Sequence, residues 1–534
     1  MKHKLLFPSL LLIFSFLVSP IRAIPQIVPQ RFDLAINNAR IVDGTGNPWF
    51  RGSIGIANGK IALISRRDIT NADRVIDAGG MIVAPGFIDV HAHTEDIFTN
   101  PTAENFLRMG VTSLVTGNCG GSTTDVAEFL GKIKTTPLAV NLATLIAHGS
   151  VRAKVMGLEN RDPSPEEQQR MNAMVEKAMR EGAVGLSTGL IYVPGTFAKT
   201  EEVVELARVA SRFGGIYASH IRNEGNEVVD AINEAINIGE AAKIPVEISH
   251  FKISSRALWG RSSQTIGLVE SARKRGLQVT VDQYAYTASS TSLDARMPNW
   301  AIAGGREEGK KRLADPSTRK KIADEMKQGL KKSKFKDYEF AYVASYRPNP
   351  EFNGKNIKEI TKLVRGKTSL ASQIEQIFEM YEQGGAQMVY RVMDEADMQN
   401  IMRQSFTMIA SDSGVRQFGS GVPHPRGYGN NARVLGRYVR ELKLLTLEDA
   451  IRKMTSLPAQ TFNLRDRGLL REGYAADMVI FDESKVADLA TFENPHQYPT
   501  GFAYVIVNGR IVFDGTTMTG EMPGQPLFGP GRGL

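Results

Sequence analysis

The stretch Pro85-Gly86-Phe87-Ile88-Asp89-Val90-His91-Ala92-His93 joins a short apolar run directly to a pair of histidines. Residues 87–90 have the length and composition of a buried strand. His91 and His93 stand two positions apart, and side chains at such positions of a strand point to the same side. Both imidazoles can therefore reach one metal ion, provided that other parts of the chain bring further ligands to the same place.

The same pattern, an apolar run that ends in a metal-capable side chain, recurs along the chain. The later runs span 111–116, 215–218, 244–248 and 406–410, and they lead to Cys119, His220, His250 and Asp412. Ligands so far apart converge only where a fold gathers strand ends at one place, as a parallel barrel does. Imidazole, thiolate and carboxylate together favour zinc over calcium or magnesium, which prefer oxygen ligands. The sequence therefore predicts a metal-dependent hydrolase.

The spacing of the predicted strand ends indicates the fold class. These ends fall near His91, Cys119, His148, Ser187, His220, His250, Asp282 and Asp412, at intervals of 28 to 39 residues before a last interval of 130. One βα unit takes about 30 residues, and helical patterns fill the gaps at 165–181, 200–213, 226–242 and 264–275. Eight strand ends with helices between them predict an α/β fold, a TIM-like (β/α)8 barrel over 86–465.

The last interval is too long for one βα unit and predicts an insertion between strands seven and eight, at 297–400. An insertion at this end of a barrel overhangs the active-site face, so we expect a lid or a substrate wall. Residues 24–85 and 466–534 instead carry short alternating runs, with turns at Asn58-Gly59 and Asn508-Gly509. We expect these two segments to build one small β-sandwich from both termini.

Residues 1–23 read as a secretory signal peptide, with Lys2 and Lys4 before an apolar stretch at 5–18 and a cleavage site after Ala23. The sequence therefore predicts a secreted or periplasmic protein with no membrane span in the mature chain. The apolar stretch is too short for a typical span, although an N-terminal anchor stays open as an alternative.

The formal charge of +8 first suggests an anionic partner. Most of this excess lies in one segment, because 306–336 holds twelve Lys and Arg residues against five Asp and Glu. Such a run is more typical of a solvated helix face, and no nucleic-acid motif accompanies it. We expect a small-molecule substrate and no nucleic acid as partner.

The predicted ligands, namely His91, His93, Cys119, His220, His250 and Asp412, are too many for one tetrahedral catalytic zinc. Two nearby sites that share Cys119 account for the number. We expect one tightly bound Zn²⁺ and a second, weaker site. Cys119, the only cysteine, would bind as thiolate, and the alternative is an inert buried thiol. Asp412 is the predicted catalytic residue, which takes a proton from water and delivers it to the leaving nitrogen. A structural cap on the next helix is the alternative for Asp412.

Five short motifs carry a resemblance to a known family. They are 85–93, Gly117-Asn118-Cys119-Gly120, Ser219-His220-Ile221-Arg222, Ser249-His250-Phe251-Lys252 and Gly473-Tyr474-Ala475-Ala476-Asp477. Together they resemble the amidohydrolase superfamily, and Cys119 with His424-Pro425-Arg426 resembles its D-aminoacylase (N-acyl-D-amino-acid deacylase) family. The resemblance covers nearly all of the chain from Phe32 to Asp514.

The resemblance implies zinc-dependent hydrolysis of the amide bond of N-acyl-D-amino acids. It also implies a tight zinc site at Cys119, His220 and His250, and a weaker site at His91, His93 and Asp412, with Cys119 as the bridge. By the same resemblance, the substrate carboxylate is expected to meet Lys252, Tyr284, Ser290 and Arg426. A guanidinium fork such as that of Arg426 matches a carboxylate bidentately, and the alternative for Arg426 is a surface arginine.

Some positions depart from the family pattern. The fourth strand, 184–189, has no lysine that could bridge two metals, which is consistent with Cys119 in that role. Tyr284-Ala285-Tyr286 leaves open which tyrosine contacts the substrate. His148 is expected to line the pocket without an assigned role, and His424 and His496 are expected to be structural.

Three other functions stay open from the sequence. One is a peptidase that releases C-terminal D-residues. Another is a cyclic-amide hydrolase of the hydantoinase or dihydroorotase type, which has less use for Arg426 and Lys252. The third is a non-catalytic binding protein that holds anionic cell-wall fragments with the basic insertion.

Overall fold

The computed structural model describes Met1 and residues 31–533, so residues 2–23 of the expected signal peptide lie outside the described residues. In the described part of the chain, no helix is both long enough and apolar enough to cross a membrane.

The apolar runs that precede the predicted ligands are strands. In chain order they are β6 (Phe87–Asp89), β8 (Val111–Thr116), β9 (Asn141–Thr144), β10 (Ile146–Ala147), β11 (Gly185–Gly189), β12 (Ile216–His220), β13 (Val246–Ile248), β14 (Val279–Gln283) and β18 (Thr407–Ile409). They pair in parallel in the orders β6-β8-β9 and β10-β11-β12-β13-β14-β18. Strands β8, β11 and β12 are buried along their whole length, as strands of a parallel sheet covered on both faces are.

Backbone hydrogen bonds connect the two parallel sheets. The N–H of Leu145, between β9 and β10, donates to the carbonyl of Thr116, and the N–H of Val184 donates to the carbonyl of Thr144. At the other end of the series, β19 (Ser413–Gly414) pairs in parallel with β7 (Ala92–His93). The N–H of Asp412 also donates to the carbonyl of His91 over 2.9 Å. The segment after the last strand therefore lies beside the segment after the first.

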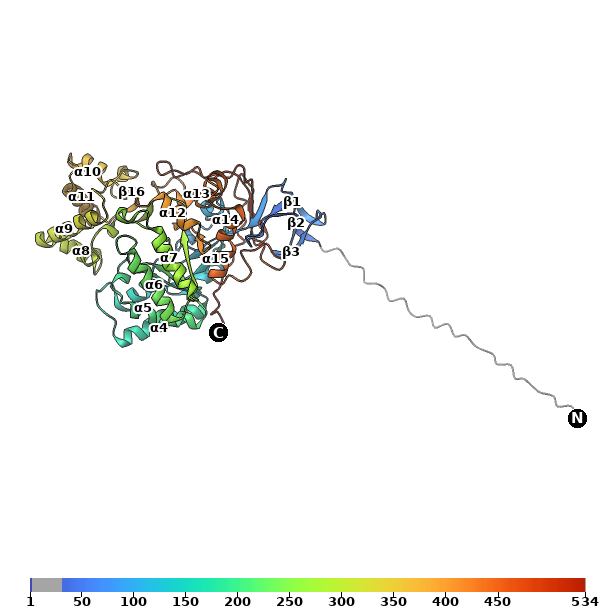
Figure 1. Cartoon of the computed structure of the whole chain (residues 1–534), viewed down its shortest axis with the longest axis horizontal. Coiled ribbons are helices and arrows are strands. Elements are labelled where there is room, and N and C mark those ends of the chain that lie inside the picture. The colour runs from blue at the N-terminus through green and yellow to red at the C-terminus, as the bar shows by residue number, and fades with distance from the viewer. Residues whose placement is uncertain (2–30, 534) are drawn as a thin grey trace.

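Helices alternate with these strands and lie around them in Figure 1. They include α3 (His148–Met156), α4 (Pro165–Glu181), α5 (Thr200–Arg212), α6 (Val228–Ala242), α7 (Ser262–Lys274), α12 (Glu395–Met402), α14 (Leu447–Met454) and α15 (Ser456–Thr461). Helix α4 shows why the chain is helical there. Ser164 and Glu167 form a capping box at its start, and Gly182, at φ 109°, ends it. Met171, Val175, Ala178 and Met179 repeat at helical spacing and form its buried face.

The segment between β14 and β18 has a hydrophobic core of its own, which runs from Tyr284 to Met393. It contains an antiparallel sheet in the order β15-β17-β16, made of β15 (Ser289–Ser292), β16 (Ala341–Ser345) and β17 (Gln387–Tyr390). Its helices are α8 (Arg306–Ala314), α9 (Pro316–Lys332), α10 (Ile357–Arg365) and α11 (Leu370–Glu382).

The observed insertion differs at both ends from the expected 297–400. It starts earlier because β15 reads Ser-Ser-Thr-Ser and has no apolar alternation that would indicate a strand. It ends earlier because α12 belongs with the helices around the parallel strands. The carboxylate of Asp397 in α12 accepts the N–H of Ser262 at the start of α7 over 3.0 Å.

Strands from the two ends of the chain form one sheet in the order β22-β21-β20-β5-β1-β2-β3, with β4 paired to β1. The N-terminal strands are β1 (Phe32–Ile41), β2 (Phe50–Ala57), β3 (Lys60–Ser65), β4 (Ala72–Asp77) and β5 (Ile82–Pro85), and the C-terminal ones are β20 (Met478–Phe481), β21 (Phe502–Val507) and β22 (Arg510–Phe513). The antiparallel pair β20-β5 joins the two termini. Strands β1 to β3 lie at the end of the molecule opposite α8 to α11 (Figure 1).

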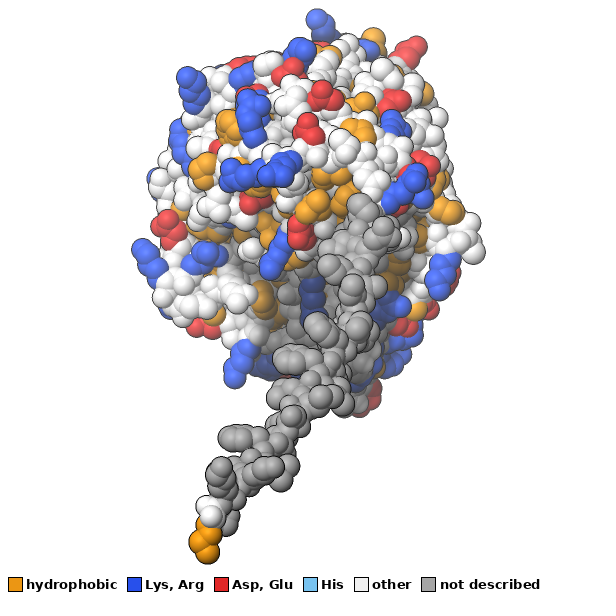
Figure 2. Space-filling model, turned by 90° about the vertical axis from the view of Figure 1, so that its right-hand side faces the viewer, with side chains coloured by type: hydrophobic (Ala, Val, Ile, Leu, Met, Phe, Trp, Pro, Cys, Tyr) orange, Lys and Arg blue, Asp and Glu red, His pale blue; other side chains and the backbone are white. Residues whose placement is uncertain are grey.

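Basic side chains on the surface have acidic neighbours. Figure 2 shows the end of the molecule near β1 to β3, where Lys and Arg side chains are interspersed with Asp and Glu. Within the basic segment 306–336, Lys310 pairs with Glu307, and both Lys320 and Lys327 pair with Asp324. These pairs stand on the outer faces of α8 and α9, as expected of a solvated helix face.

Candidate metal centre

Three of the predicted ligands have a left-handed backbone, which is uncommon for residues other than glycine. The φ angles are 54° at Cys119, 38° at His250 and 52° at Asp412. Each such residue costs about 1–3 kcal/mol and persists where the surrounding structure enforces it. The N–H of His250 donates to Asp282 over 2.9 Å, which holds this strand end in place. Gly189 leaves room for Cys119, because a Cβ on Gly189 would lie 2.0 Å from the carbonyl oxygen of Cys119.

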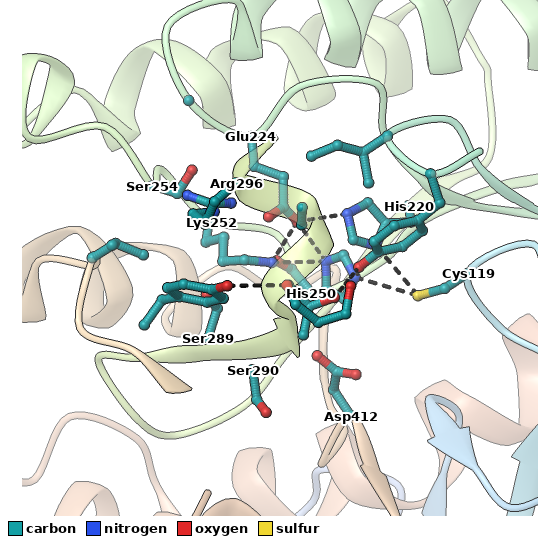
Figure 3. Close-up of a pocket in the computed structure, with 18 of the residues that line it drawn as sticks. Cys119, His220, Glu224, His250, Lys252, Ser254, Ser289, Ser290, Arg296 and Asp412 are labelled. Atoms are coloured by element: carbon teal, nitrogen blue, oxygen red, sulfur yellow. Dashed lines mark hydrogen bonds and ion pairs between the residues drawn. The ribbon is translucent and has the colours of Figure 1, made fainter. Parts of the chain in front are cut away.

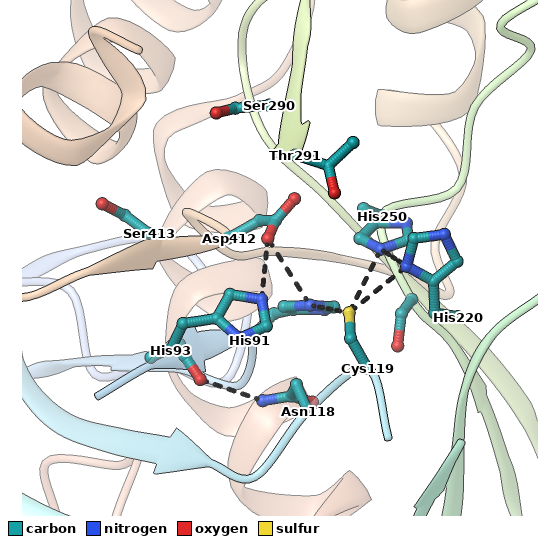
Figure 4. A network of polar contacts seen from close by, with 12 residues as sticks. His91, His93, Asn118, Cys119, His220, His250, Ser290, Thr291, Asp412 and Ser413 are labelled. Atoms are coloured by element: carbon teal, nitrogen blue, oxygen red, sulfur yellow. Dashed lines mark hydrogen bonds and ion pairs between the residues drawn. The ribbon is translucent and has the colours of Figure 1, made fainter. Parts of the chain in front are cut away.

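Three imidazole nitrogen atoms converge around the sulfur of Cys119 (Figure 4). Cys119 Sγ lies 3.2 Å from His91 Nε2, 3.3 Å from His220 Nδ1 and 3.5 Å from His250 Nε2. Zinc–nitrogen and zinc–sulfur bond lengths place ligand atoms of a tetrahedral site about 3.3–3.6 Å apart. The donor set and its spacing therefore fit zinc.

A second group of donors lies beside the first. Asp412 Oδ1 is 3.1 Å from His93 Nε2 and 3.7 Å from His91 Nε2. The side chain of His93 is 37% exposed, whereas His91 is fully buried and His220 and His250 are nearly so. The structure thus brings all of the predicted metal ligands together, with His93 nearest to solvent.

The electrostatics of the centre favour a bound cation. Burial would raise the pKa of the Cys119 thiol, but the charges of His91 and His220 outweigh it and hold that pKa well below the usual value. Burial lowers the pKa of His93, yet its hydrogen bonds to Asp412 and Cys119 raise it to about 10. The negative charges of the thiolate and the carboxylate therefore favour a positive charge close to them. A bound metal ion can supply this charge, as bound protons can.

Two acidic side chains to which the sequence analysis gave no role contact the ring nitrogen atoms of His91 and His250 that do not face Cys119. Asp282 accepts a hydrogen bond from His91 Nδ1 over 2.9 Å, and Glu224 Oε1 lies 2.8 Å from His250 Nδ1. Such partners fix the tautomer and orientation of metal-binding imidazoles. Asp282 is the last residue but one of β14, and the sequence analysis identified it only as the end of a predicted strand. Glu224 lies in the loop after β12, and its place four residues after His220 was the sole signal in the sequence.

The residues expected to bind the substrate carboxylate are mostly engaged with the protein. Lys252 is buried and pairs with Glu224. Arg426 Nη1 lies 2.8 Å from Asp412 Oδ2, and the Ser290 hydroxyl donates to the carbonyl of Met388 over 2.8 Å.

The two candidate tyrosines lie behind the cavity wall and do not line it. The ring of Tyr284 packs 4.5 Å from the guanidinium carbon of Arg426, and its hydroxyl donates to Met393 Sδ. The hydroxyl of Tyr286 donates to Asp488. Tyr192 does line the cavity, with its ring edge against His220 and its hydroxyl 3.0 Å from Thr291 Oγ1. The sequence analysis did not identify Tyr192, which follows β11 in a loop without a metal ligand.

A cavity of about 800 Å³ opens onto the metal centre (Figure 3). Its inner end is lined by Cys119, His220, His250 and Asp412, and its outer wall by residues of the insertion, including Met326 and Leu330 of α9. The insertion therefore contributes directly to the space in which a ligand would lie.

The remaining histidines among residues 31–533 are held in structural hydrogen bonds. His148 Nε2 contacts Glu202 over 2.8 Å, and Arg152 pairs with the same carboxylate. His148 is therefore placed away from the cavity that it was expected to line. His424 bonds the carbonyl of Ala288, and His496 bonds that of Gly421.

A model of the amidohydrolase family matches residues 74–265 and 374–513 and leaves out most of the insertion. The chain belongs to the amidohydrolase family. This assignment confirms the resemblance carried by the strand-end motifs. Among its curated relatives, D-aminoacylase of Alcaligenes xylosoxydans xylosoxydans is 35% identical and covers 93% of this chain and 98% of its own. N-acyl-D-glutamate deacylase of the same organism is also 35% identical, over 91% of this chain and 94% of its own.

Solved structures of similar proteins agree with this family assignment. The structure of N-acyl-D-glutamate deacylase from Bordetella bronchiseptica, complexed with zinc and a phosphonate mimic of the tetrahedral intermediate, is 32% identical with a TM-score of 0.80. It covers 93% of this chain and 100% of its own. L-hydantoinase from Arthrobacter aurescens, 17% identical with a TM-score of 0.51 over 93% of this chain and 100% of its own, shares the fold alone.

Proposed function

We propose that this amidohydrolase uses zinc to hydrolyse the amide bond of N-acyl-D-amino acids, releasing a carboxylic acid and a D-amino acid. The observation that carries the proposal is the convergence of Cys119, His220 and His250 at the inner end of a cavity that also contains the Asp412–Arg426 pair. The printed activities of relatives that span nearly the whole chain support it.

Cys119, His220 and His250 would hold the tightly bound zinc, because their donor atoms are buried and close together. His91, His93 and Asp412 would form the weaker site, since His93 is partly exposed and its imidazole is freer to move. When bound, zinc supplies Lewis acidity that polarises a carbonyl group and makes water acidic enough to act as a nucleophile near neutral pH.

Asp412 is proposed as the group that carries the proton. Burial would raise its pKa, but the charge of Arg426 and the hydrogen bond to His93 hold that pKa well below its usual value. Its carboxylate is therefore ionised at neutral pH and ready to accept a proton from the attacking water. Delivery of this proton to the amide nitrogen completes the cleavage, as general acid–base catalysis requires.

Arg426 is proposed to bind the α-carboxylate of the substrate. Its Nε is buried and has no hydrogen-bond acceptor within the described residues, so that the guanidinium retains a donor for an incoming carboxylate. Tyr284 would act by holding Arg426 through its ring. Lys252 and Ser290 would contribute after exchanging their present partners, Glu224 and Met388.

We further propose that the parallel strands close into a (β/α)8 barrel and that the terminal sheet folds into a small β-sandwich. The β19-β7 pair, which brings the end of the last strand to the first, supports the closure. We also propose a signal peptide at 1–23 and secretion or a periplasmic location. N-terminal sequencing of the exported protein tests this, with Ile24 as the expected first residue.

A substrate panel tests the proposed activity. Purified zinc-loaded protein is assayed with N-acetyl-D- and N-acetyl-L-amino acids, a dipeptide with a C-terminal D-residue, and a hydantoin. We expect turnover of the N-acetyl-D-amino acids above all others. Turnover of the hydantoin alone would overturn the proposal in favour of a cyclic-amide hydrolase, and turnover of the dipeptide alone would favour the peptidase. Protein that lacks zinc when purified without chelator, and that turns over nothing, would favour a binding protein.

A further inference from the structure

The C-terminal end of α9 forms one edge of the cavity. The cavity is lined there by Gly329, Leu330, Ser333 and Phe335. The helix ends in a Schellman motif, in which the N–H of Phe335 donates to the carbonyl of Leu330 over 3.0 Å. Lys334 takes the left-handed position of this motif, at φ 57°. The chain therefore turns back at the cavity, and Leu330 and Phe335 pack in the same hydrophobic core.

Exposed lysines alternate with these lining residues along the chain. We refer to them as the lysine rim, which consists of Lys331, Lys332, Lys334 and Lys336. Residues 329–336 contain these four lysines and no Asp or Glu, so that the stretch carries a formal charge of +4. Charges of one sign around a cleft raise the local concentration of the oppositely charged ligand.

The lysine rim differs from the other lysines of this basic segment. Lys310, Lys320 and Lys327 have carboxylates as partners. Among residues 31–533, by contrast, no carboxylate lies within ion-pair distance of any lysine of the rim. Two of the four stand in the last turn of α9, where a positive charge interacts favourably with the helix dipole. Lys334 and Lys336 lie beyond the helix, so this explanation does not extend to them.

A contact with the loop after β12 fixes the rim beside the cavity. The side-chain amide of Asn226 in this loop donates to Ser333 Oγ over 3.1 Å, and both residues line the cavity. Ser333 stands between the two halves of the rim. The unpaired lysines therefore lie where the insertion meets the loops that follow the parallel strands.

The charges that line the cavity itself cancel. Four carboxylates and four Lys or Arg side chains line it, and two ion pairs, Lys252 with Glu224 and Arg426 with Asp412, join members of the two groups. The positive charges of the rim are therefore in excess at this edge. An anion that approaches the cavity past α9 meets this excess before it meets the metal centre.

We propose that the lysine rim attracts small carboxylate anions electrostatically and draws them into the cavity. The inference rests on the proposed deacylase activity for the identity of the anion, because every N-acyl amino acid carries an α-carboxylate. The rim would act on substrate capture and leave the reaction at the metal centre unchanged. Its reach is the Debye length, which is about 30 Å at 0.01 M salt and about 3 Å at 1 M salt.

The test replaces the rim with neutral side chains in one variant, Lys331→Gln, Lys332→Gln, Lys334→Asn and Lys336→Gln. Asparagine is used at 334 because it tolerates the left-handed backbone. With the monoanion N-acetyl-D-methionine at about 0.01 M salt, we expect KM to rise about tenfold at constant kcat, the lower end of the range for electrostatic steering. At about 1 M salt, the variant and the wild type should have equal KM.

A second fourfold variant with the same change in net charge is the matched control. It combines Lys60→Gln, Lys134→Gln, Lys274→Gln and Lys443→Asn. These lysines are exposed and do not line the cavity. The backbone of Lys443 is left-handed at φ 49°, which matches that of Lys334. We expect this variant to keep the KM of the wild type at both salt concentrations, and zinc content and thermal melting verify that both variants are folded.

Zinc extraction provides a readout that does not depend on deacylase activity. Dipicolinate is a dianionic chelator and phenanthroline is a neutral one, and the cavity is their route to the metal centre. At about 0.01 M salt, the rim variant should lose zinc to dipicolinate at least about tenfold more slowly than the wild type does. Its rate of zinc loss to phenanthroline should equal that of the wild type.

Two results would overturn the inference. One is a rim variant that keeps the KM and the dipicolinate rate of the wild type at low salt. The other is an equal fall in the rates with dipicolinate and phenanthroline, which would show that the lysines act through the shape of the cavity edge and not through their charge. A wild type that hydrolyses no N-acyl-D-amino acid would refute the proposed deacylase activity, and zinc extraction would still decide the role of the rim.

Discussion

Cys119 is the residue on which the two proposed metal sites depend. Its sulfur lies within 3.5 Å of ring nitrogen atoms of His91, His220 and His250. Its left-handed backbone, at φ 54°, aims this sulfur at the histidines. A substitution that removes only the sulfur of Cys119 therefore tests its role as a metal ligand separately from its role in the fold.

Replacement of Cys119 by alanine should abolish both zinc retention and activity, because the shared ligand is lost while the cavity remains. Zinc per chain, measured by atomic absorption, and kcat with an N-acetyl-D-amino acid check this expectation. Ser122→Ala, in the same loop, serves as the control. A Cys119→Ala variant with full zinc and full activity would refute the bridging role.

Asp412→Asn should separate the two proposed sites, because Asp412 is both a ligand of the proposed weaker site and the proposed proton carrier. The amide keeps the shape but accepts no proton, so we expect a fall in kcat of about 10²–10⁴-fold, the range of general acid–base catalysis. The zinc at Cys119, His220 and His250 should stay at one per chain. Loss of that zinc would show that Asp412 is needed for tight binding.

Glu224→Gln should weaken zinc binding without direct loss of a ligand. Glu224 accepts from His250 Nδ1 and also neutralises Lys252. Partners of this kind contribute about 10- to 100-fold to metal affinity, and chelator competition measures this factor. The exposed Glu227, which caps α6 without a side-chain hydrogen bond, provides the control Glu227→Gln. Equal zinc affinities in both variants would contradict a positioning role for Glu224.

At the scale of the element, each strand end and the loop after it act as one unit. The strands are short and buried, and the ligand follows directly, so that the position of the side chain is set by the pairing of the strand. The side chains of the insertion are instead positioned by packing within the insertion itself. Its own core holds β15, β16 and β17 together, and its α9 reaches the cavity. Ligand binding can therefore change in the insertion while the metal centre stays the same.

Helix α14 contains a buried lysine whose charge is unfavourable. Burial lowers the pKa of Lys453 from 10.5 to about 8, although its Nζ donates to the carbonyls of Gln404 and Thr407. The unfolded chain keeps its proton up to a higher pH than the folded protein does. The charged form therefore destabilises the fold fully below about pH 8, and the destabilisation is lost as pH rises toward 10.5.

We expect the free energy of unfolding of the wild type, relative to Lys453→Met, to rise by up to about 3 kcal/mol between pH 8 and pH 10.5. Urea unfolding at fixed zinc concentration measures this difference, and Lys443→Met, on the exposed loop before α14, controls for the loss of a charge. A difference that stays constant with pH would show that Lys453 has an ordinary pKa in the folded protein.

At the scale of the whole molecule, the described terminal segments, 31–85 and 466–533, are bound together and to the parallel strands. Strand β20 pairs with β5, which runs almost directly into β6. Asp477, next to β20, accepts hydrogen bonds from Arg467 and from Asn141 of β9 over 2.6 and 2.9 Å. The terminal sheet is thus part of the support of the strands that carry the ligands.

Removal of residues 466–534 should therefore prevent folding rather than yield an active protein. Loss of β20 exposes the core residues Ile36 and Val83 and leaves the edge of β5 unpaired. The soluble fraction and the zinc content of the truncated chain measure the effect. A soluble truncated protein with full zinc would show that the parallel strands fold independently of the terminal sheet.

The sequence by itself determined the family, the order of the strands and the set of metal-capable residues that converge at the candidate metal centre. Each ligand directly follows an apolar run, and burial of such a run is a local property that the sequence displays. Only the tertiary structure decided which carboxylate meets which cation. The pairs formed by Asp412 with Arg426 and by Glu224 with Lys252 join different loops. Such contacts leave no periodic pattern in the sequence from which they could be predicted. For the same reason, the serine-rich β15 and the lining residue Tyr192 became evident only when the strands were assembled around the cavity.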